Sequence, residues 1–459
     1  MAEAPQPLRS GSLGGALANL RWLLGSRGVN AILSLFYIAI VTRSLGAAGF
    51  GQFALVTGTG GAIVTIISFQ TWQIIVRYGT EHLHAGRPDR LARLLKGALA
   101  LDAAGALLGS LIAVAAVAAL APAFGWSPDM RRDTFLFCCA ALLSMRSTPT
   151  GILRLHDRFA AAAFADTALP VVRLAGAALV LAAGPSVRGF LIAWAAAELA
   201  SSIAFWVSAA RVARGLPWRR APLSLPALRA DNPGILHFAA ITNSAQTLTL
   251  ATRQLPVLLV GFFASPAAAG AYRLAHQLGR AMARVSQLFA RALFPELMRI
   301  RTAAGSSAEF GPMIARIVRT AALGGGLLLL LLLMAGRPLL ELVAGPEFAA
   351  AYPLLLLLGA AAVVDLIGVA FEPALIASGQ AGRSFRVQLV AAAALIGLMV
   401  VLIPRAGTIG AAAAVLAGSL LGFALMAVAV RRVLRRRPGA EEAALAASLE
   451  AHPPRHNDH

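Results

Sequence analysis

Charged residues, aromatic rings and cysteine are all scarce in this chain of 459 residues. Only 13% of the residues are charged and 7% are aromatic, whereas 58% are hydrophobic and the mean hydropathy is +0.74. So low a charged fraction excludes an ordinary soluble globular domain, in which about 25% of the residues are charged. Apolar runs of about 20 residues, the length of a helix that crosses the hydrocarbon core, recur from Val29 to Val430. The composition therefore predicts an all-α polytopic membrane protein.

Groups that carry enzyme or metal chemistry are also missing. The chain has 2 cysteines, Cys138 and Cys139, which are neighbours in an apolar run. This arrangement lacks the spacing of metal ligands, and a disulfide between neighbours would be strained. The sequence contains no GxSxG, no HExxH and no phosphate-binding Gly-Lys-Ser/Thr loop. We therefore expect no catalytic residues, no metal site and no cofactor.

Acidic residues are half as numerous as basic ones, with 20 Asp and Glu against 40 Lys and Arg, and the net charge is +20. Most basic residues fall in alternate connections, which we assign to the cytoplasm. The other connections hold only Arg43, Arg131, Arg132, Arg188, Arg337 and Arg405. This positive-inside pattern predicts an even number of spans with both termini cytoplasmic. It explains the net charge without nucleic acid, which we do not expect as a partner.

Twelve membrane spans are expected, six in each half of the chain. Those of the first half cover residues 29–46, 53–76, 98–121, 134–153, 161–183 and 189–210. Those of the second half cover residues 236–262, 268–293, 317–335, 353–377, 387–403 and 410–430.

The domain organisation follows from these spans. An N-terminal six-helix lobe (29–210) and a C-terminal six-helix lobe (236–430) are joined by a cytoplasmic linker (211–235) rich in proline and arginine. Residues 1–28 are expected to form a cytoplasmic or interfacial amphipathic segment, and residues 431–459 a basic cytoplasmic tail. Weak likenesses between the halves occur in the same order, which is typical of parallel repeats around a midplane site.

Arginines inside the predicted spans are the unusual feature of this sequence. Apart from Arg43 and Arg319, which lie near span ends and are counted with the connections, they are Arg146, Arg173, Arg253, Arg273, Arg280, Arg284 and Arg291, of which the last four share one face of the eighth span. Snorkelling to the head groups explains Arg291 and is an alternative for Arg273. A central arginine that faced lipid would cost roughly 2.5 to 3.5 kcal/mol. The central arginines are therefore expected to face a hydrated, cationic central cleft.

Surplus positive charge in such a cleft would attract an anion, and guanidinium groups suit phosphate because they stay charged and donate in a fork. The expected pyrophosphate-binding set is Arg146, Arg173, Arg253, Arg273, Arg280 and Arg284. The polar side chains expected to contact or flank a sugar are His276, Gln277, Gln254 and Asn243. The polar stretch SFQTWQ at Ser68 adds weaker candidates.

Intramembrane acids provide the competing interpretation, in which the arginines only form ion pairs. The candidates are Asp102, Asp166, Glu198, Asp365 and Glu372, of which Asp102 and Glu198 have a purely structural interpretation as buried partners. Asp365 and Glu372 lie seven residues apart and so share a face of the tenth span. They are candidates for binding a coupling proton or sodium ion, and pairing with arginines is an equally good explanation.

Four stretches resemble bacterial polysaccharide flippases of the O-antigen type. VTRSLGAAGFGQFALV at Val41 contains the recurrent pattern R-x-LG-x-x-x-(Y/F)G-x-(F/Y) of their turn between the first two spans. The other stretches are VLLVGFFASPAAAGAYRLAHQL at Val257, LLELVAGPEFAAAYPLLLLL at Leu339 and IPRAGTIGAAAAVLAGSLLG at Ile403. The resemblance spans almost the whole chain and implies membership in the superfamily of multidrug and toxin extrusion transporters and the peptidoglycan-precursor flippase.

That resemblance implies two six-helix lobes around a central cleft and transport by alternating access in a bacterial inner membrane. The implied substrate is an undecaprenyl-pyrophosphate-linked oligosaccharide for O-antigen, capsule or exopolysaccharide. The implied partners are the lipid bilayer, a polysaccharide polymerase and a chain-length regulator. Two alternatives stay open: a drug or small-cation antiporter on the same fold, and a membrane polymerase or ligase that acts on lipid-linked sugars. The basic cleft argues against the first, and the short outside loops argue against the second.

Overall fold

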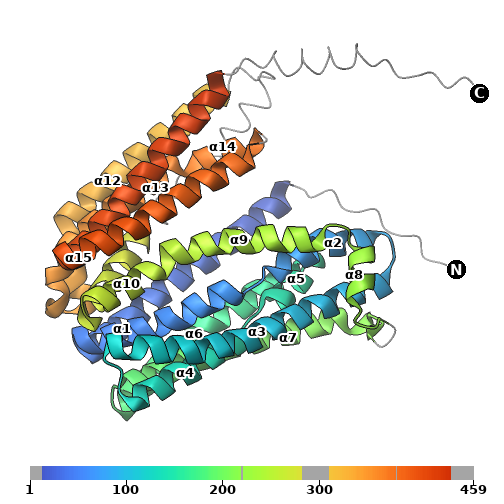
Figure 1. Cartoon of the computed structure of the whole chain (residues 1–459), viewed down its shortest axis with the longest axis horizontal. Helices are drawn as coiled ribbons and strands as arrows, with labels where there is room; N and C mark the ends of the chain where they lie inside the picture. Colours follow the sequence, from blue (N-terminus) through green and yellow to red (C-terminus); the bar gives the residue numbers. More distant parts are fainter. Residues whose placement is uncertain (1–12, 219–220, 282–309, 379, 436–459) are drawn as a thin grey trace, which may run out of the picture. The chain divides into compact units, whose positions relative to one another are not determined.

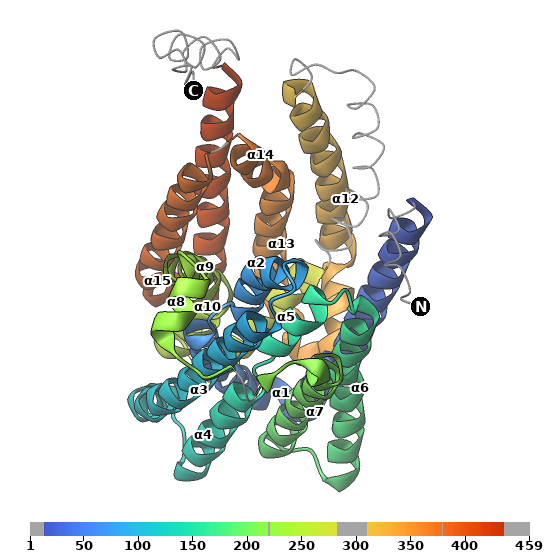
Figure 2. The same ribbon diagram turned by 90° about the vertical axis from the view of Figure 1, so that its right-hand side faces the viewer.

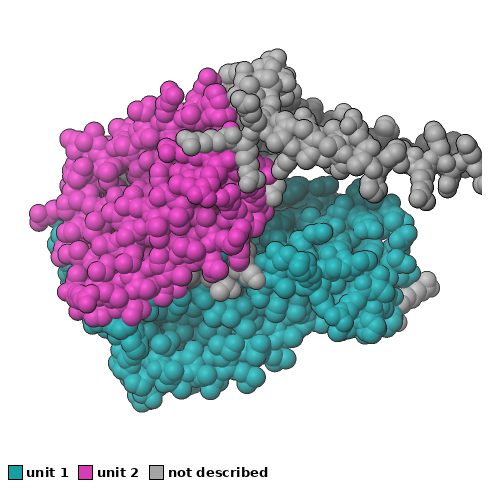
Figure 3. Space-filling model, turned by 45° about the horizontal axis from the view of Figure 1, so that its top comes forward, with its two compact units in different colours: residues 1–271, 340–349 teal, residues 272–339, 350–459 magenta. Residues whose placement is uncertain are grey.

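The computed structural model describes residues 13–218, 221–281, 310–378 and 380–435, and the regular structure of this part is entirely helical (Figure 1). The described chain forms two compact units, coloured separately in Figure 3. Unit 1 contains Met1–Ala271 and Leu340–Ala349, and unit 2 contains Tyr272–Leu339 and Ala350–His459. Each unit is described by itself below.

Unit 1 is built from helices that follow one another through short connections. They are α1 (Leu13–Ile67), α2 (Thr71–His84), α3 (Pro88–Phe124), α4 (Pro128–Leu143), α5 (Ser147–Leu155), α6 (Phe159–Ala183), α7 (Val187–Val212), η1 (Ala213–Gly215), α8 (Leu225–Asp231), α9 (Ile235–Arg253) and α10 (Leu255–Phe263). Successive helices α6 and α7 lie side by side (Figure 2). Their shared face carries the most prominent polar cluster of the unit.

Unit 2 contains the part of the helix at residues 266–281 that follows Ala271, together with the later helices. These are α12 (Phe310–Ala344), η4 (Pro346–Ala351), α13 (Tyr352–Ile367), η5 (Gly368–Ala370), α14 (Phe371–Ala377) and α15 (Ala381–Arg435). The end of α12 and most of η4 belong to unit 1.

Eight helical stretches of the described residues are long and apolar enough to cross a membrane. Two of these stretches each contain two predicted spans. In both, the connection expected between the two spans is a bend within one continuous helix. The stretch Leu33–His84 bends at Gly46, and Ala381–Leu434 bends at Gly407, where both glycines adopt a positive φ that other residues disfavour. The fold class predicted from the sequence, an all-α polytopic membrane protein, is confirmed.

The bend of α1 at Gly46 is held by residues far away in sequence. The Glu347 carboxylate accepts a hydrogen bond from the Ala47 N–H at 3.2 Å, and so caps the part of α1 that follows the bend. The Arg43 guanidinium donates to the carbonyl oxygens of Glu341 and Leu342. A Cβ added at Gly51 would lie 1.9 Å from the Pro266 carbonyl oxygen, so only glycine allows this approach. Three of the four stretches that resemble the flippases thus meet at one junction.

Four predicted spans are interrupted inside the membrane. The interruptions are residues 68–70 between α1 and α2, 144–146 between α4 and α5, Gln254 between α9 and α10, and η5 between α13 and α14. Proline follows three of them, as Pro149, Pro256 and Pro373. Proline lacks the N–H that would continue the helical hydrogen bonds, so it favours the start of a new helix. The interruptions place polar residues such as Gln70, Arg146 and Gln254 within the predicted spans.

Helix α8, in the described part of the predicted linker, packs against α2 and α3. Leu228 of α8 packs in a cluster with Ile74, Tyr78 and Leu94. Asp231, at the end of α8, forms ion pairs with Arg90 at 3.2 Å and with Arg93. The linker therefore contains a short helix that the sequence did not predict, and that helix is fixed to unit 1 by apolar and charged contacts.

Candidate functional site

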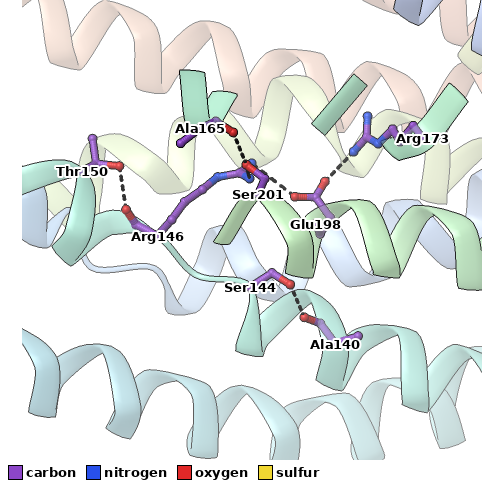
Figure 4. Close-up of polar contacts among 8 residues, drawn as sticks. All are labelled: Ala140, Ser144, Arg146, Thr150, Ala165, Arg173, Glu198 and Ser201. Carbon is purple, nitrogen blue, oxygen red and sulfur yellow. Dashed lines mark hydrogen bonds and ion pairs between the residues drawn. The ribbon is translucent and has the colours of Figure 1, made fainter. Parts of the chain in front are cut away.

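Arg146 lies at the interruption between α4 and α5, immediately before the first residue of α5. Its side chain extends to α7, where Nη1 donates to Ser201 Oγ at 2.7 Å and Nη2 lies 3.2 Å from Glu198 Oε2 (Figure 4). The Ser201 hydroxyl donates in turn to the Ala165 carbonyl oxygen of α6 at 3.1 Å. From the break in the span, Arg146 thus reaches the interface of α6 and α7.

Arg173 reaches the same carboxylate from α6. Its Nη2 donates to Glu198 Oε1, the oxygen that Arg146 does not contact (Figure 4). The Arg173 Cζ lies 3.5 Å from the centre of the Trp194 ring, a cation–π contact. Trp194 is itself held by edge contacts with Tyr37 and Phe53, at 5.6 and 5.5 Å between ring centres. An aromatic platform therefore fixes the second guanidinium.

We name these five residues, Arg146, Arg173, Trp194, Glu198 and Ser201, the Glu198 cluster. Two guanidiniums and one carboxylate give it a surplus of one positive charge. Its charged side chains are only partly covered, with exposed fractions of 29% for Arg146, 16% for Arg173 and 19% for Glu198. Arg146 and Arg173 are thus paired with an acid, as the ion-pair interpretation predicts, and the cluster keeps a net positive charge.

Asp102 has a different role from Glu198. Thr148 donates to its Oδ2 through the hydroxyl at 2.7 Å and the backbone N–H at 3.2 Å, and the Thr71 hydroxyl donates to its Oδ1 at 3.1 Å. Thr71 begins α2 and Thr148 lies in the first turn of α5. A buried carboxylate at two helix N-termini is stabilised by their exposed N–H groups and dipoles. Asp102 is thus a buried structural partner of two broken spans.

A second group of expected residues surrounds the interruption between α9 and α10. Arg253 ends α9 and is exposed, and Gln254 occupies the break itself. The Gln254 amide lies against α1, because a Cβ added at Gly61 would be 2.7 Å from Gln254 Nε2. Asn243 lies earlier on α9, and its Oδ1 is buried without a hydrogen-bond partner among the described residues. This region offers a cation and two amides beside α1.

Unit 2 holds the remaining described candidates. Arg273, His276, Gln277 and Arg280 follow one another on the helix at residues 266–281, and the His276 ring stacks on Tyr272 at 5.8 Å between centres. Arg280 and Asp365 of α13 interact electrostatically, and Ser419 of α15 lies near the Asp365 carboxylate. Asp365 therefore lies near an arginine, as the ion-pair interpretation of the intramembrane acids predicts.

Glu372 and Asp365 are separated by η5 rather than joined by one regular helix. Glu372 is exposed, and its Oε1 accepts a hydrogen bond from Gln388 Nε2 at 2.8 Å. Arg284 and Arg291 lie outside the described residues. The described part of the chain holds no group of three or more His, Cys, Asp or Glu residues arranged to bind a metal ion.

The helix interruptions at Arg146 and Gln254 are the site feature that the sequence reasoning missed, whereas a kink beside Glu372 is indicated by Pro373. Three expected site residues, Arg146, Gln254 and Glu372, lie at an interruption or in the first turn after it. The signal was present, because each is followed within three residues by Pro149, Pro256 or Pro373 inside an apolar run. Discontinuous membrane helices are typical of substrate and ion sites in transporters.

Comparison with known proteins supports a particular family. A family model described as polysaccharide biosynthesis protein matches residues 16–301. The inner membrane protein YghQ of Escherichia coli (strain K12) is 30% identical over 351 residues, which cover 74% of this chain and 95% of that protein.

Two solved structures share the fold. The lipid II flippase MurJ, in an inward closed conformation, superposes with a TM-score of 0.69 over 90% of this chain and 87% of its own. An inward-facing multidrug resistance MATE family transporter of the MOP superfamily superposes with a TM-score of 0.65 over 89% and 96%. Each is 12% identical to this chain, so the likeness is one of fold.

Proposed function

Because the chain belongs to the polysaccharide biosynthesis protein family, we propose that it is a flippase for a polyprenyl-pyrophosphate-linked oligosaccharide. The substrate would move from the cytoplasmic to the periplasmic leaflet of a bacterial inner membrane by alternating access. The undecaprenyl carrier and a product in O-antigen, capsule or exopolysaccharide synthesis belong to this proposal. The resemblance noted in the sequence, to polysaccharide flippases of the wider transporter superfamily, is confirmed by the family match and the shared fold.

The observation that carries the proposal is the Glu198 cluster, a cationic group inside the membrane-spanning part of unit 1. Membrane proteins keep charged residues at depth where they serve a substrate or ion path. Two guanidiniums that converge on one anion match the doubly acidic pyrophosphate better than a neutral or cationic solute. Arg146 and Arg173 are therefore assigned the first contacts with the pyrophosphate.

The other arginines extend this assignment. Further cationic contacts along the path of the head group would come from Arg253, next to a helix break, and from Arg273, Arg280 and Arg284, which the sequence predicts on one helix face. His276, Gln277, Gln254 and Asn243 would contact or flank the sugars, for which amides and imidazole supply both donors and acceptors. The polyprenyl chain would stay in the surrounding lipid.

Coupling to an ion is a separate part of the proposal and rests on Asp365 and Glu372. Either acid would bind a proton or sodium ion and so link a gradient to the change of conformation. We expect the double variant Asp365→Asn with Glu372→Gln to transport at a rate that no longer depends on the ion gradient. Transport with unchanged gradient dependence would remove both acids from the coupling mechanism.

The proposed function is tested by translocation of a fluorescent polyprenyl-pyrophosphate oligosaccharide in proteoliposomes. We expect transport by the unmodified chain and at least a tenfold loss in the double variant Arg280→Gln with Arg284→Gln. The matched control is Arg383→Gln with Arg386→Gln, which removes the same charge from a predicted cytoplasmic position and is expected to transport normally.

Two results would contradict the proposal. Transport of cationic dyes but not of the lipid-linked sugar would favour the antiporter, which the likeness to a MATE transporter keeps in consideration. Formation of a longer glycan without translocation would favour the polymerase or ligase. A polysaccharide polymerase and a chain-length regulator are proposed partners, which co-purification from a native membrane would detect.

A further inference from the structure

Glu198 occupies the position that an anionic ligand of Arg146 and Arg173 would take. Each of its carboxylate oxygens contacts a different guanidinium, and both arginines turn to it from different helices (Figure 4). Carboxylate and phosphate offer paired oxygens of similar spacing, which is why arginine binds both in the same forked geometry. The carboxylate is therefore a close stand-in for one phosphate group of the substrate.

Both guanidiniums are also held by contacts that do not involve Glu198. Arg146 donates to Ser201 at 2.7 Å, and Arg173 lies on the Trp194 ring at 3.5 Å. The Arg173 Nε is a further buried donor without a hydrogen-bond partner among the described residues. If the carboxylate moved away, these contacts would hold both arginines in place. The N–H groups released from Glu198 could then donate to a ligand.

When no substrate is bound, the two arginines need a negative charge beside them, and Glu198 provides it. Two unpaired arginines at membrane depth would be costly, because removing one member of a buried ion pair leaves an uncompensated charge. Glu198 supplies the missing charge when no substrate is bound. A pyrophosphate carries more negative charge than one carboxylate, so it can displace Glu198, and the carboxylate can displace it again during release.

We propose that Glu198 is an exchange ligand, which holds the arginines when the site is empty and competes with the pyrophosphate so that the substrate can leave. This inference rests on the proposed function and adds a residue that governs release rather than capture. In this positioning role Glu198 opposes binding of the substrate, whereas the arginines favour it. Removal of Glu198 should therefore tighten binding and slow transport.

The experiment measures the dissociation constant of farnesyl pyrophosphate for the purified full chain in detergent, and the translocation rate of the lipid-linked sugar in proteoliposomes. Glu198→Gln keeps the size of the side chain and removes its charge. We expect its dissociation constant to fall about tenfold, and its transport rate at saturating substrate to fall as well. Arg146→Gln should instead raise the dissociation constant at least tenfold.

Asp231 provides the matched control. Like Glu198 it is one carboxylate shared by two arginines, Arg90 and Arg93, but it fixes the linker helix α8 to α3. Asp231→Asn should leave the affinity for farnesyl pyrophosphate unchanged. If Glu198→Gln fails to fold, Glu198→Asp replaces it, because the shorter acid keeps the charge and reaches only one arginine. It should bind farnesyl pyrophosphate more tightly than the unmodified chain, by a smaller factor.

The outcomes separate this inference from the function on which it rests. Weaker or unchanged affinity in Glu198→Gln or Glu198→Asp, together with weaker affinity in Arg146→Gln, would overturn the exchange role and leave the pyrophosphate site intact. Faster transport in Glu198→Gln would overturn it too. Absence of farnesyl pyrophosphate binding by the unmodified chain would refute the pyrophosphate site itself, and the exchange role with it.

Discussion

At the scale of single residues, Asp102 shows how a buried acid in a membrane helix serves the fold. It accepts hydrogen bonds from Thr71 and Thr148 at the starts of α2 and α5. We expect Asp102→Asn to lower the free energy of unfolding by about 1 to 2 kcal/mol, the range of a lost helix cap. Thermal unfolding in detergent measures this loss. Glu81→Gln, at an exposed acid of α2, is the control, and equal stability of the two variants would refute the capping role.

Gly51 is a residue whose lack of a side chain is required by a close approach. A Cβ at this position would lie 1.9 Å from the Pro266 carbonyl oxygen, a backbone atom that cannot turn away as a side chain can. We expect Gly51→Ala to destabilise the protein by more than the 1 to 3 kcal/mol usual for overpacking, with loss of monodisperse protein in size-exclusion chromatography.

The control for Gly51 is Gly397 in α15, where an added Cβ meets nothing within 4 Å. Alanine there should be neutral or stabilising by up to about 1 kcal/mol, because it is the better helix former. A normal yield of Gly51→Ala would show that the helix at residues 266–281 is not held against α1 in the way described.

The charged residues of the site could be identified from the sequence, but their partners could not. Arg146 and Arg173 stand out because an arginine inside an apolar run is costly and rare. Their shared partner depends on how α6 packs on α7, which brings Glu198 between them. Five acids were available in the spans, and periodicity along one helix carries no information about contacts between helices.

At the scale of helices, interruptions inside the spans decide where polar groups are placed. Length and hydropathy predicted a helical membrane protein, since a membrane fixes the length of an apolar helix. They did not predict that the span at residues 134–153 divides into α4 and α5, or that the span at 236–262 divides into α9 and α10. An averaged hydropathy does not respond to a single proline.

Pro256 tests the importance of such a break. We expect Pro256→Ala to favour a continuous helix through Gln254, because it restores an N–H and removes a clash with the preceding turn. Unfolding stability should rise by at least about 1 kcal/mol, a fraction of the usual proline penalty, while translocation of the lipid-linked sugar falls several-fold. Thermal unfolding and the proteoliposome assay measure the two effects.

Pro122 is the matched control for Pro256. It lies inside α3 in the last turn before Gly125, so its replacement by alanine mends no interruption. Pro122→Ala should leave transport unchanged. If Pro256→Ala also transported normally, the break at Gln254 would have no role in the passage of the substrate.

At the scale of the whole molecule, the distribution of charge predicts which ends of the helices face the cytoplasm. Asp129 precedes most of α4 at a predicted periplasmic end, and Glu81 lies near the end of α2 at a predicted cytoplasmic end; both are exposed. In a chain with Cys138→Ala and Cys139→Ala, a membrane-impermeant thiol reagent added to intact cells should label Asp129→Cys and not Glu81→Cys. Labelling of Glu81→Cys and not of Asp129→Cys in intact cells would reverse the predicted topology.

The division of the chain into lobes was predicted from composition, and the compact units follow contacts instead. Unit 1 extends beyond the linker to Ala271 and takes in Leu340–Ala349. The sequence could not indicate this, because the contacts of Glu347 with Ala47 and of Arg43 with Leu342 join residues about 300 positions apart. The lobe boundaries at 211–235 stay a prediction.

The residues at the bend of α1 identify the family, and they differ from the residues of the Glu198 cluster that are proposed to bind the substrate. The stretches by which this chain is recognised as a relative of the flippases, at Val41, Val257 and Leu339, supply the residues that lie against one another there. Around Gly46 and Gly51 the shared pattern of these stretches is explained by packing. Relatives can therefore keep these packing contacts and still diverge at the proposed substrate site. Sorting relatives by cargo should rest on the positions of Arg146, Arg173 and Glu198 rather than on the stretches that reveal kinship.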